Sequence, residues 1–285
     1  MWYPRMFRSG KTGDASNSES DSMEDASSGI SGMFQDHGGA SMSVDIDAAS
    51  SSLRTPRSFV LPMHYEPSYG YPLIVWLHDD GHNEHQLEQV MPHISLRNFV
   101  GVGIRGVRAA DSVGHRFDWP QKQASIHAAW RRIDGVIEEA KQRFSVHDQR
   151  IILAGYGSGA TMALRIALRQ PNQFGGVVAL GGRLPQQGRL FGDLNALRER
   201  KLPLLWQWAT RGGRFSSEAL TSDLKALMAT RCQVEVRQYT DAEEMNTVTL
   251  ADINDWIMRT VVSGSVGHSE SPAEPRVTRA PFSTN

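Results

Sequence analysis

Short apolar runs that alternate with segments of helical periodicity constrain the fold of this chain more than any other feature. Tyr71–His78 (YPLIVWLH) is almost entirely apolar, which is typical of a strand buried on both faces of a sheet. Further strands are predicted at Phe99–Ile104, Arg150–Gly155, Gly175–Gly182, Leu202–Trp208 and Gln233–Tyr239, with an edge strand at Ser58–Pro62. Helical spacing of apolar residues predicts helices at 123–144, 159–170, 217–230 and 250–262. The alternation indicates an α/β fold, with a mostly parallel twisted sheet of about seven or eight strands and helices on both faces.

Composition divides the chain into a central domain and two tails. Residues 1–55 are rich in Ser, Asp and Gly and predict a mildly acidic, disordered tail. Residues 264–285 predict a second disordered tail, so the α/β domain is expected to span residues 56–263.

Charge and cysteine content exclude several classes of function. The chain has 30 basic and 31 acidic residues, so a general attraction to nucleic acid or to anionic membranes is not expected. The one cysteine, Cys232, excludes an internal disulfide and favours a reducing, cytoplasmic compartment. No apolar run approaches the ~20 residues of a membrane-spanning helix, and no signal peptide is expected from the first residues.

The segment LAGYGSGATMAL, which starts at Leu153, reads as a strand, a glycine-rich turn and a helix. Together with PLIVWLHDDGHNE and PNQFGGVVALGG, it resembles the phospholipase/carboxylesterase group of α/β-hydrolases, with overlap toward dienelactone-hydrolase and polyester-depolymerase-like esterases. The resemblance extends over about residues 59–262. The family pattern L-A-G-F-S-Q-G-G-A-M-A-L places the nucleophilic serine at Gly157. Sliding the pattern to use Ser158 would put Tyr156 where the helix must pack closely against the strand.

The same resemblance implies that the other two members of the catalytic triad are also replaced. The family's acid falls on Gly212, and its histidine falls on Glu244. In a triad the serine attacks, the histidine takes its proton and the acid orients the histidine. Loss of all three predicts a degenerate site. Glycine at 157 also relieves the strain of a positive φ angle at this turn.

The loop after the first buried strand departs from the family in a further way. The family has H-G-x-G-x there, whose amides help to bind an oxyanion, whereas this chain has HDDGH. Asp79 and Asp80 are interpreted as solvated loop carboxylates, with a cation-tolerant or amine-binding pocket as the alternative. Ser158 is expected to offer its backbone N–H to an oxyanion and to cap the following helix with its hydroxyl.

Two other groups of residues could bind a ligand. The segment His78–His85 is rich in His, Asp and Glu, but it lacks a recognised spacing of metal ligands, so no metal is predicted and His78 is expected to support the loop. The loop 103–121 could line a cleft through Arg105, His115 and Trp119, with Arg116 and Asp118 beside them; packing is the favoured role of these residues. GYGSGA lacks the context of a dinucleotide fingerprint, and no cofactor is expected.

Three functions remain open. The favoured one is a pseudo-hydrolase of the phospholipase/carboxylesterase type that binds an unknown small molecule or protein. The second is an active ester or thioester hydrolase with relocated machinery, in which Ser158 attacks and a residue such as His115 acts as base. The third is a structural or interaction protein that acts through its acidic N-terminal tail.

Overall fold

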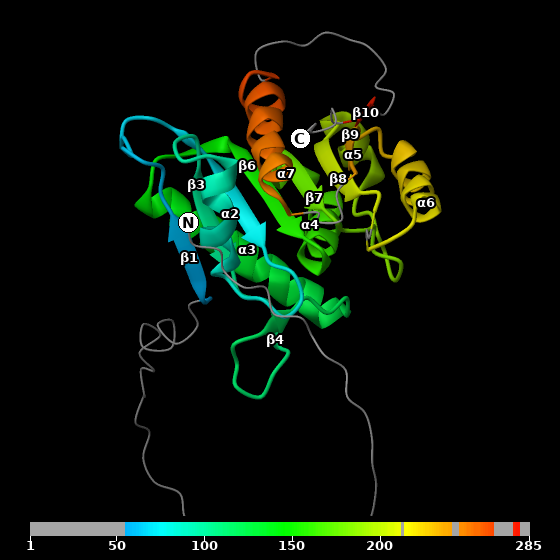
Figure 1. The fold of residues 1–285 in the computed structure, drawn as a ribbon, viewed down its shortest axis with the longest axis horizontal. Helices are drawn as coiled ribbons and strands as arrows, with labels where there is room; N and C mark the ends of the chain where they lie inside the picture. Colours follow the sequence, from blue (N-terminus) through cyan, green and yellow to red (C-terminus); the bar gives the residue numbers. More distant parts are fainter. Residues whose placement is uncertain (1–54, 212–213, 241–244, 265–275, 280–285) are drawn as a thin grey trace, which may run out of the picture. The chain divides into compact units, whose positions relative to one another are not determined.

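An eight-stranded sheet in the order β1-β3-β2-β6-β7-β8-β9-β10 forms the centre of the fold (Figure 1). The computed structural model describes residues 55–211, 214–240, 245–264 and 276–279. Within these ranges the strands of the sheet are β1 (Arg57–Val60), β2 (Tyr71–Leu77), β3 (Val100–Ile104), β6 (Val146–Tyr156), β7 (Gly176–Leu180), β8 (Pro203–Ala209), β9 (Gln233–Tyr239) and β10 (Arg276–Arg279). Only β1 runs antiparallel to its neighbour, so the described sheet is mostly parallel, as predicted.

Helices cover both faces of the sheet. They are α2 (Gln86–Ile94), α3 (Gln123–Arg143), α4 (Ser158–Arg169), α5 (Leu194–Arg200), α6 (Ser217–Met228) and α7 (Thr247–Trp256), with short helices η1 (Pro171–Gln173) and η2 (Ile257–Val262). Apolar side chains of α2 and α7 pack on one face, and those of α3, α4 and α6 pack on the other. This arrangement is the α/β architecture that the alternating pattern predicts.

The strand β2 shows why its sequence is continuously apolar. Leu73, Val75 and Leu77 point into the core under α3 and α4, whereas Ile74 and Trp76 point into the core under α2 and α7. Successive side chains of a strand face opposite sides of the sheet, so a strand covered on both faces needs apolar residues at every position. All seven residues of β2 are buried.

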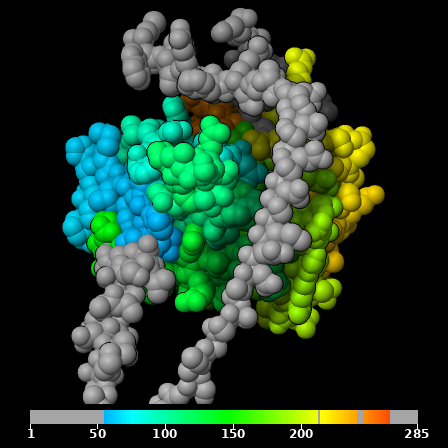
Figure 2. Space-filling view, turned by 90° about the horizontal axis from the view of Figure 1, so that it is seen from below, coloured from blue at the N-terminus to red at the C-terminus, as the bar shows by residue number. Residues whose placement is uncertain are grey.

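A short hairpin, β4 (Arg108–Ala109) and β5 (Phe117–Asp118), was not predicted from the sequence. It follows β3 and projects from the body of the domain (Figure 1). Figure 2 shows the domain from below, and the blue-green part of the chain, which contains this hairpin, stands out there between the blue N-terminal part of the domain and its yellow part. The loop at its tip is held by Asp111, whose carboxylate accepts the amides of Gly114, His115 and Arg116.

Three further elements differ from the sequence-based expectations. The helices α2 and α5 were not predicted, although α2 has apolar residues at helical spacing. Residues 276–279 form β10 beside β9, so the segment 264–285, which was predicted to be disordered, contains a strand. The predicted acidic tail, apart from Thr55, lies outside the described residues, and an interaction role for it stays a prediction.

Candidate functional site

A sharp turn joins β6 to α4 at the carboxyl edge of the sheet, where the sequence predicts it. Tyr156 ends the strand, Gly157 has a φ of +54°, and Ser158 is the first residue of the helix. The Gly157 amide donates to the Leu180 carbonyl at 2.9 Å, which ties the turn to β7. The positive φ predicted for Gly157 is confirmed, and glycine is the residue that adopts such a conformation with little strain.

Close packing around this turn identifies its central residue. A Cβ atom added to Gly155 would lie 2.6 Å from the Gly159 carbonyl carbon, and one added to Gly159 would lie 2.2 Å from the Leu77 oxygen. Both positions therefore require glycine, because helix α4 touches the backbone of β6 and β2. The residue midway between them is Gly157, which supports the register that places the nucleophile position there rather than at Ser158.

The space that a nucleophile would need at Gly157 is filled by Asp79. A Cβ atom added to Gly157 would lie 2.0 Å from Asp79 Oδ1 and 2.7 Å from Arg214 Nη1, both closer than the 3.0 Å that real Cβ atoms keep. Any side chain at position 157 would therefore collide with the carboxylate. Asp79 follows β2 and is only 5% exposed.

Three N–H groups hold the Asp79 carboxylate. Its Oδ1 accepts the Ser158 amide at 3.1 Å and Arg214 Nη1 at 3.1 Å, and its Oδ2 accepts Arg214 Nη2 at 2.5 Å. The Arg214 guanidinium also lies over the Tyr156 ring, 4.6 Å from its centroid. Burial alone would lower the pKa of Arg214, but the interactions with Asp79 and Tyr156 together outweigh burial and raise that pKa, so the guanidinium stays charged.

These contacts correct the interpretation of the HDDGH loop. Asp79 is a buried member of an ion pair rather than a solvated carboxylate, and its charge is balanced by Arg214 rather than offered to a cation or amine. Asp80, one residue later, is exposed as predicted.

Ser158 also differs from expectation. The prediction that its hydroxyl caps α4 is wrong: the residue before the helix is Gly157, and no side chain caps this end. The Ser158 Oγ atom is buried and has no hydrogen-bond partner in the described part of the chain. Its backbone N–H, expected to face an oxyanion, is taken by Asp79.

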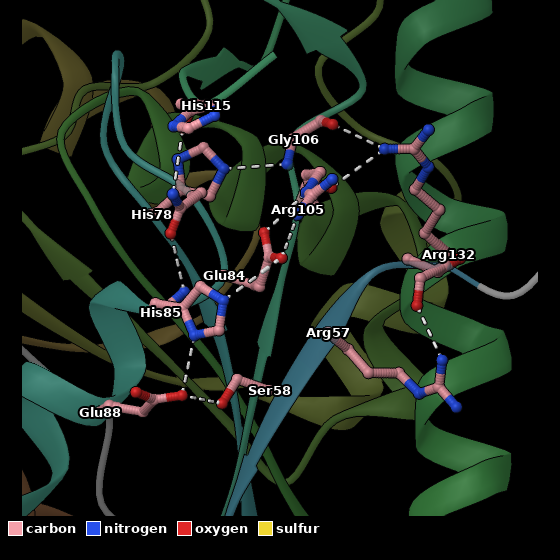
Figure 3. Close-up of polar contacts among 12 residues, drawn as sticks. Arg57, Ser58, His78, Glu84, His85, Glu88, Arg105, Gly106, His115 and Arg132 are labelled. Carbon is pink, nitrogen blue, oxygen red and sulfur yellow. Dashed lines mark hydrogen bonds and ion pairs between the residues drawn. The ribbon is translucent and has the colours of Figure 1, made fainter. Parts of the chain in front are cut away.

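His78 supports the loop between β2 and α2. Its Nε2 accepts the Gly106 amide at 2.9 Å (Figure 3). Its proton therefore resides on Nδ1, which donates to the Asp79 carbonyl at 2.7 Å. The Trp119 indole donates to the His78 carbonyl at 2.8 Å. Burial lowers the pKa of His78, which favours the neutral ring that these bonds require.

The other predicted cleft residues have structural partners or lie on the surface. Arg105 forms a two-pronged pair with the buried Glu84, at 2.8 and 2.5 Å (Figure 3). The Arg105 guanidinium also lies over the Phe117 ring. His115 is exposed, and its carbonyl accepts the Asn83 side chain. Asp118, half-buried in β5, pairs with the exposed Arg108, and Arg116 is exposed. Among the described residues no three His, Cys, Asp or Glu side chains converge as a metal site.

Comparison with known proteins identifies the family. The family model of phospholipases and carboxylesterases matches residues 110–261, which is more than half of the chain. The chain belongs to the phospholipase/carboxylesterase family. No protein in the curated collection matches it.

Solved structures agree with this family's α/β-hydrolase fold. The Bacillus cereus carboxylesterase is 16% identical with a TM-score of 0.59, and the match covers 74% of this chain and 97% of the other. Arabidopsis thaliana SOBER1 is 19% identical with a TM-score of 0.54, covering 67% and 99%. A Dyadobacter fermentans phospholipase/carboxylesterase is 16% identical with a TM-score of 0.52, covering 72% and 96%. At these identities the likeness concerns the fold.

Two replacements relative to the family pattern fit one another in space. The resemblance noted in the sequence predicts glycine at position 79 and serine at position 157, where this chain has Asp79 and Gly157. The Asp79 carboxylate lies where a Cβ atom at position 157 would be. Either replacement alone would leave a clash or a cavity.

Gly212 and Glu244, the other two predicted triad positions, lie outside the described residues. The strands that lead toward them end side by side, because the Thr210 amide donates to the Tyr239 carbonyl at 2.8 Å. Arg214 is the site residue that sequence reasoning missed. It is 135 residues from Asp79 in the sequence, and no local pattern links the two.

None of the helices in the described ranges has both the length and the apolar character that crossing a membrane requires.

Proposed function

We propose that this chain is a member of the phospholipase/carboxylesterase family that binds a small molecule or a protein partner without hydrolysing it. The observation that carries the proposal is the position of the Asp79 carboxylate. It occupies the space next to Gly157 where a nucleophile would project, and it accepts the Ser158 amide. The nucleophile and one oxyanion donor are thereby replaced by a single buried carboxylate.

The chemistry of ester hydrolysis explains why this matters. A serine hydrolase needs an attacking oxygen, a base beside it and free N–H groups where the oxyanion forms. Removal of one oxyanion donor alone slows an acyl-transfer enzyme by roughly 10²–10³-fold. In this chain that donor is bonded to Asp79, and position 157 has no side-chain oxygen.

The alternative with Ser158 as nucleophile has less support. Its hydroxyl is buried and has no partner within the described residues, so no described base is in hydrogen-bond contact with it. A serine without a neighbouring base stays protonated and is a weak nucleophile. The His115 backbone is held on the hairpin loop by Asp111, and its exposed side chain is directed to solvent rather than into the core.

The carboxyl edge of the sheet is the expected place for a ligand. Open α/β sheets bind ligands outside the carboxyl ends of their strands. In this chain the β2–α2 loop and the turn at Gly157 lie at that edge. Arg214 follows β8 and forms an ion pair with Asp79 at the same edge. The hairpin β4–β5 joins the β2–α2 loop through the amide of Gly81, which donates to the Phe117 carbonyl at 3.0 Å.

Labelling with a fluorophosphonate probe tests the proposal. The full chain is incubated with the probe beside Ser158→Ala, with an added active serine hydrolase as positive control in the same tube, and modified peptides are mapped by mass spectrometry. We expect labelling of the added hydrolase only. Labelling of Ser158 in the native chain, absent from Ser158→Ala, would show that the nucleophile has moved by one position.

A further inference from the structure

We propose that the Asp79 carboxylate is an exchangeable internal ligand, and that the site it fills binds small carboxylate anions from solution. This inference rests on the proposed function, because it assigns a ligand class to the same non-hydrolysing site. In the structure a carboxylate is already bound there, by the Ser158 amide and by two nitrogen atoms of Arg214.

The three donors are suited to a carboxylate. The two Arg214 nitrogens meet both oxygens of the group, which is the paired geometry in which guanidinium binds carboxylate most strongly. The Ser158 amide belongs to the first turn of α4, where unpaired amides and the helix dipole favour an anion. Gly157 has no side chain, so position 157 does not compete with the bound carboxylate for the space that the carboxylate fills.

The donors are held in place by contacts that do not involve Asp79. The Ser158 amide is fixed because α4 packs directly on β2 and β6 through Gly155 and Gly159. The turn is also bonded to β7 by the Gly157 amide. Arg214 rests on the Tyr156 ring through a cation–π contact. The donor set is therefore preorganised, which lowers the cost of binding a second carboxylate in place of the first.

Asp79, in contrast, reaches the site through its side chain alone. Its backbone is anchored by its amide, which donates to Gln86 Oε1 at 3.2 Å, and by its carbonyl, which accepts the His78 ring. A change of the Asp79 side-chain rotamer removes the carboxylate from the donors and breaks neither of these bonds. The Arg214 side chain is 42% exposed, so the site borders solvent at this residue.

The Asp79 carboxylate competes with an anion from solution for the same donors, and so it lowers the apparent affinity for that anion. An anion can bind only to the fraction of molecules in which Asp79 has left the donors, and the apparent Kd rises by the inverse of that fraction. If this open state is about one tenth or less of the population, removal of the Asp79 carboxylate tightens binding on the order of tenfold or more. Acetate is the natural probe, because it is the excised side chain of aspartate.

The test is acetate titration of the full chain at constant ionic strength, with chloride as the balancing anion, followed by calorimetry. Asp79→Ala is compared with Asp80→Ala, which removes the same charge from the exposed neighbouring residue. We expect saturable binding to the native chain and to Asp80→Ala, and binding to Asp79→Ala that is on the order of tenfold tighter or more. Adding Arg214→Ala to Asp79→Ala should abolish it.

The proposal is overturned if Asp79→Ala and Asp80→Ala bind acetate with equal affinity while circular dichroism shows that both variants are folded. The absence of saturable binding to the native chain would also overturn it, because Asp79 would then be a permanent part of the core. If Asp79→Ala does not fold, Asp79→Asn keeps the size of the side chain, weakens its hold on Arg214 and should bind acetate more tightly than the native chain. The proposed function is tested separately: labelling of Ser158 by the fluorophosphonate probe would overturn it, whatever the result of the acetate titration.

Discussion

A double-mutant cycle on Gly157 and Asp79 tests whether the two positions share one space. In Gly157→Ser the new Cβ would lie 2.0 Å from Asp79 Oδ1, at a residue whose φ is +54°. Overpacking of this kind costs about 1–3 kcal/mol, and a side chain at a disfavoured backbone conformation costs about 1–3 kcal/mol more. Gly157→Ser alone should therefore lower the free energy of unfolding by about 2–6 kcal/mol.

Asp79→Gly alone should cost about 2 kcal/mol, because it removes the acceptor of the Ser158 amide and the two hydrogen bonds between Arg214 and the Asp79 carboxylate. Arg214 is partly exposed and regains water, so the larger cost of a fully buried orphan charge does not apply. In the double variant the collision with the Asp79 carboxylate is absent, and only the backbone strain and the close approach to Arg214 Nη1, the end of a flexible side chain, remain. The double variant should be more stable than the sum of the single changes predicts, by about 1–3 kcal/mol.

Urea unfolding of the four proteins, followed by tryptophan fluorescence, measures this coupling. Gly135→Ser is the matched control, because a Cβ atom at Gly135 has nothing within 4 Å, and its effect should simply add to that of Asp79→Gly. Additivity within about 0.5 kcal/mol for Gly157 and Asp79 would refute the reasoning. It would mean that Asp79 does not occupy the space beside Gly157 in solution.

Three further predictions concern residues around the site. Ser158→Ala should change the free energy of unfolding by less than about 1 kcal/mol, because its hydroxyl makes no hydrogen bond within the described residues, and a larger loss in urea unfolding would show a hidden partner. Arg105→Ala should destabilise the fold by about 2–4 kcal/mol, because it removes the guanidinium partner of the buried Glu84 carboxylate, whereas a near-neutral effect in thermal unfolding would favour a ligand-binding role for Arg105. Burial lowers the pKa of His78, so the unfolded chain takes up a proton near pH 6.5 that the folded chain does not. The contribution of His78 is thus fully present above pH 6.5 and is lost as the pH falls toward its lower folded pKa; the slope of unfolding free energy between pH 5 and 7 should flatten in His78→Gln, and an unchanged slope would contradict this.

The sheet and most of its helices could be predicted because their signals are local. Burial on both faces forces every residue of β2 to be apolar, and that run is visible in the sequence. The turn at Gly157 was also predictable, because close approach of α4 requires Gly155 and Gly159 at fixed spacing. The helix α2 was missed although Leu87, Val90 and Met91 have helical spacing, since the segment is short and contains Pro92.

The position of the Asp79 carboxylate beside Gly157 could not be predicted, because it depends on contacts between segments that are distant in the sequence. Asp79 and Arg214 are polar residues in loops, where solvation is the ordinary expectation. Their pairing across 135 residues follows from the sheet order, which brings the ends of β2, β6 and β8 to one edge. The Asp79 carboxylate accepts the Ser158 amide. The Ser158 hydroxyl makes no hydrogen bond within the described residues, so it lacks the capping role that local rules suggest.

Hydrolysis of p-nitrophenyl acetate by the purified full chain is the most direct test of the central claim. The account predicts a rate that does not saturate with substrate and is the same in the native chain and in Ser158→Ala, because no nucleophile faces a free oxyanion donor at the Gly157 turn. Saturable turnover by the native chain that disappears in Ser158→Ala would contradict the account and identify an active esterase with a displaced serine.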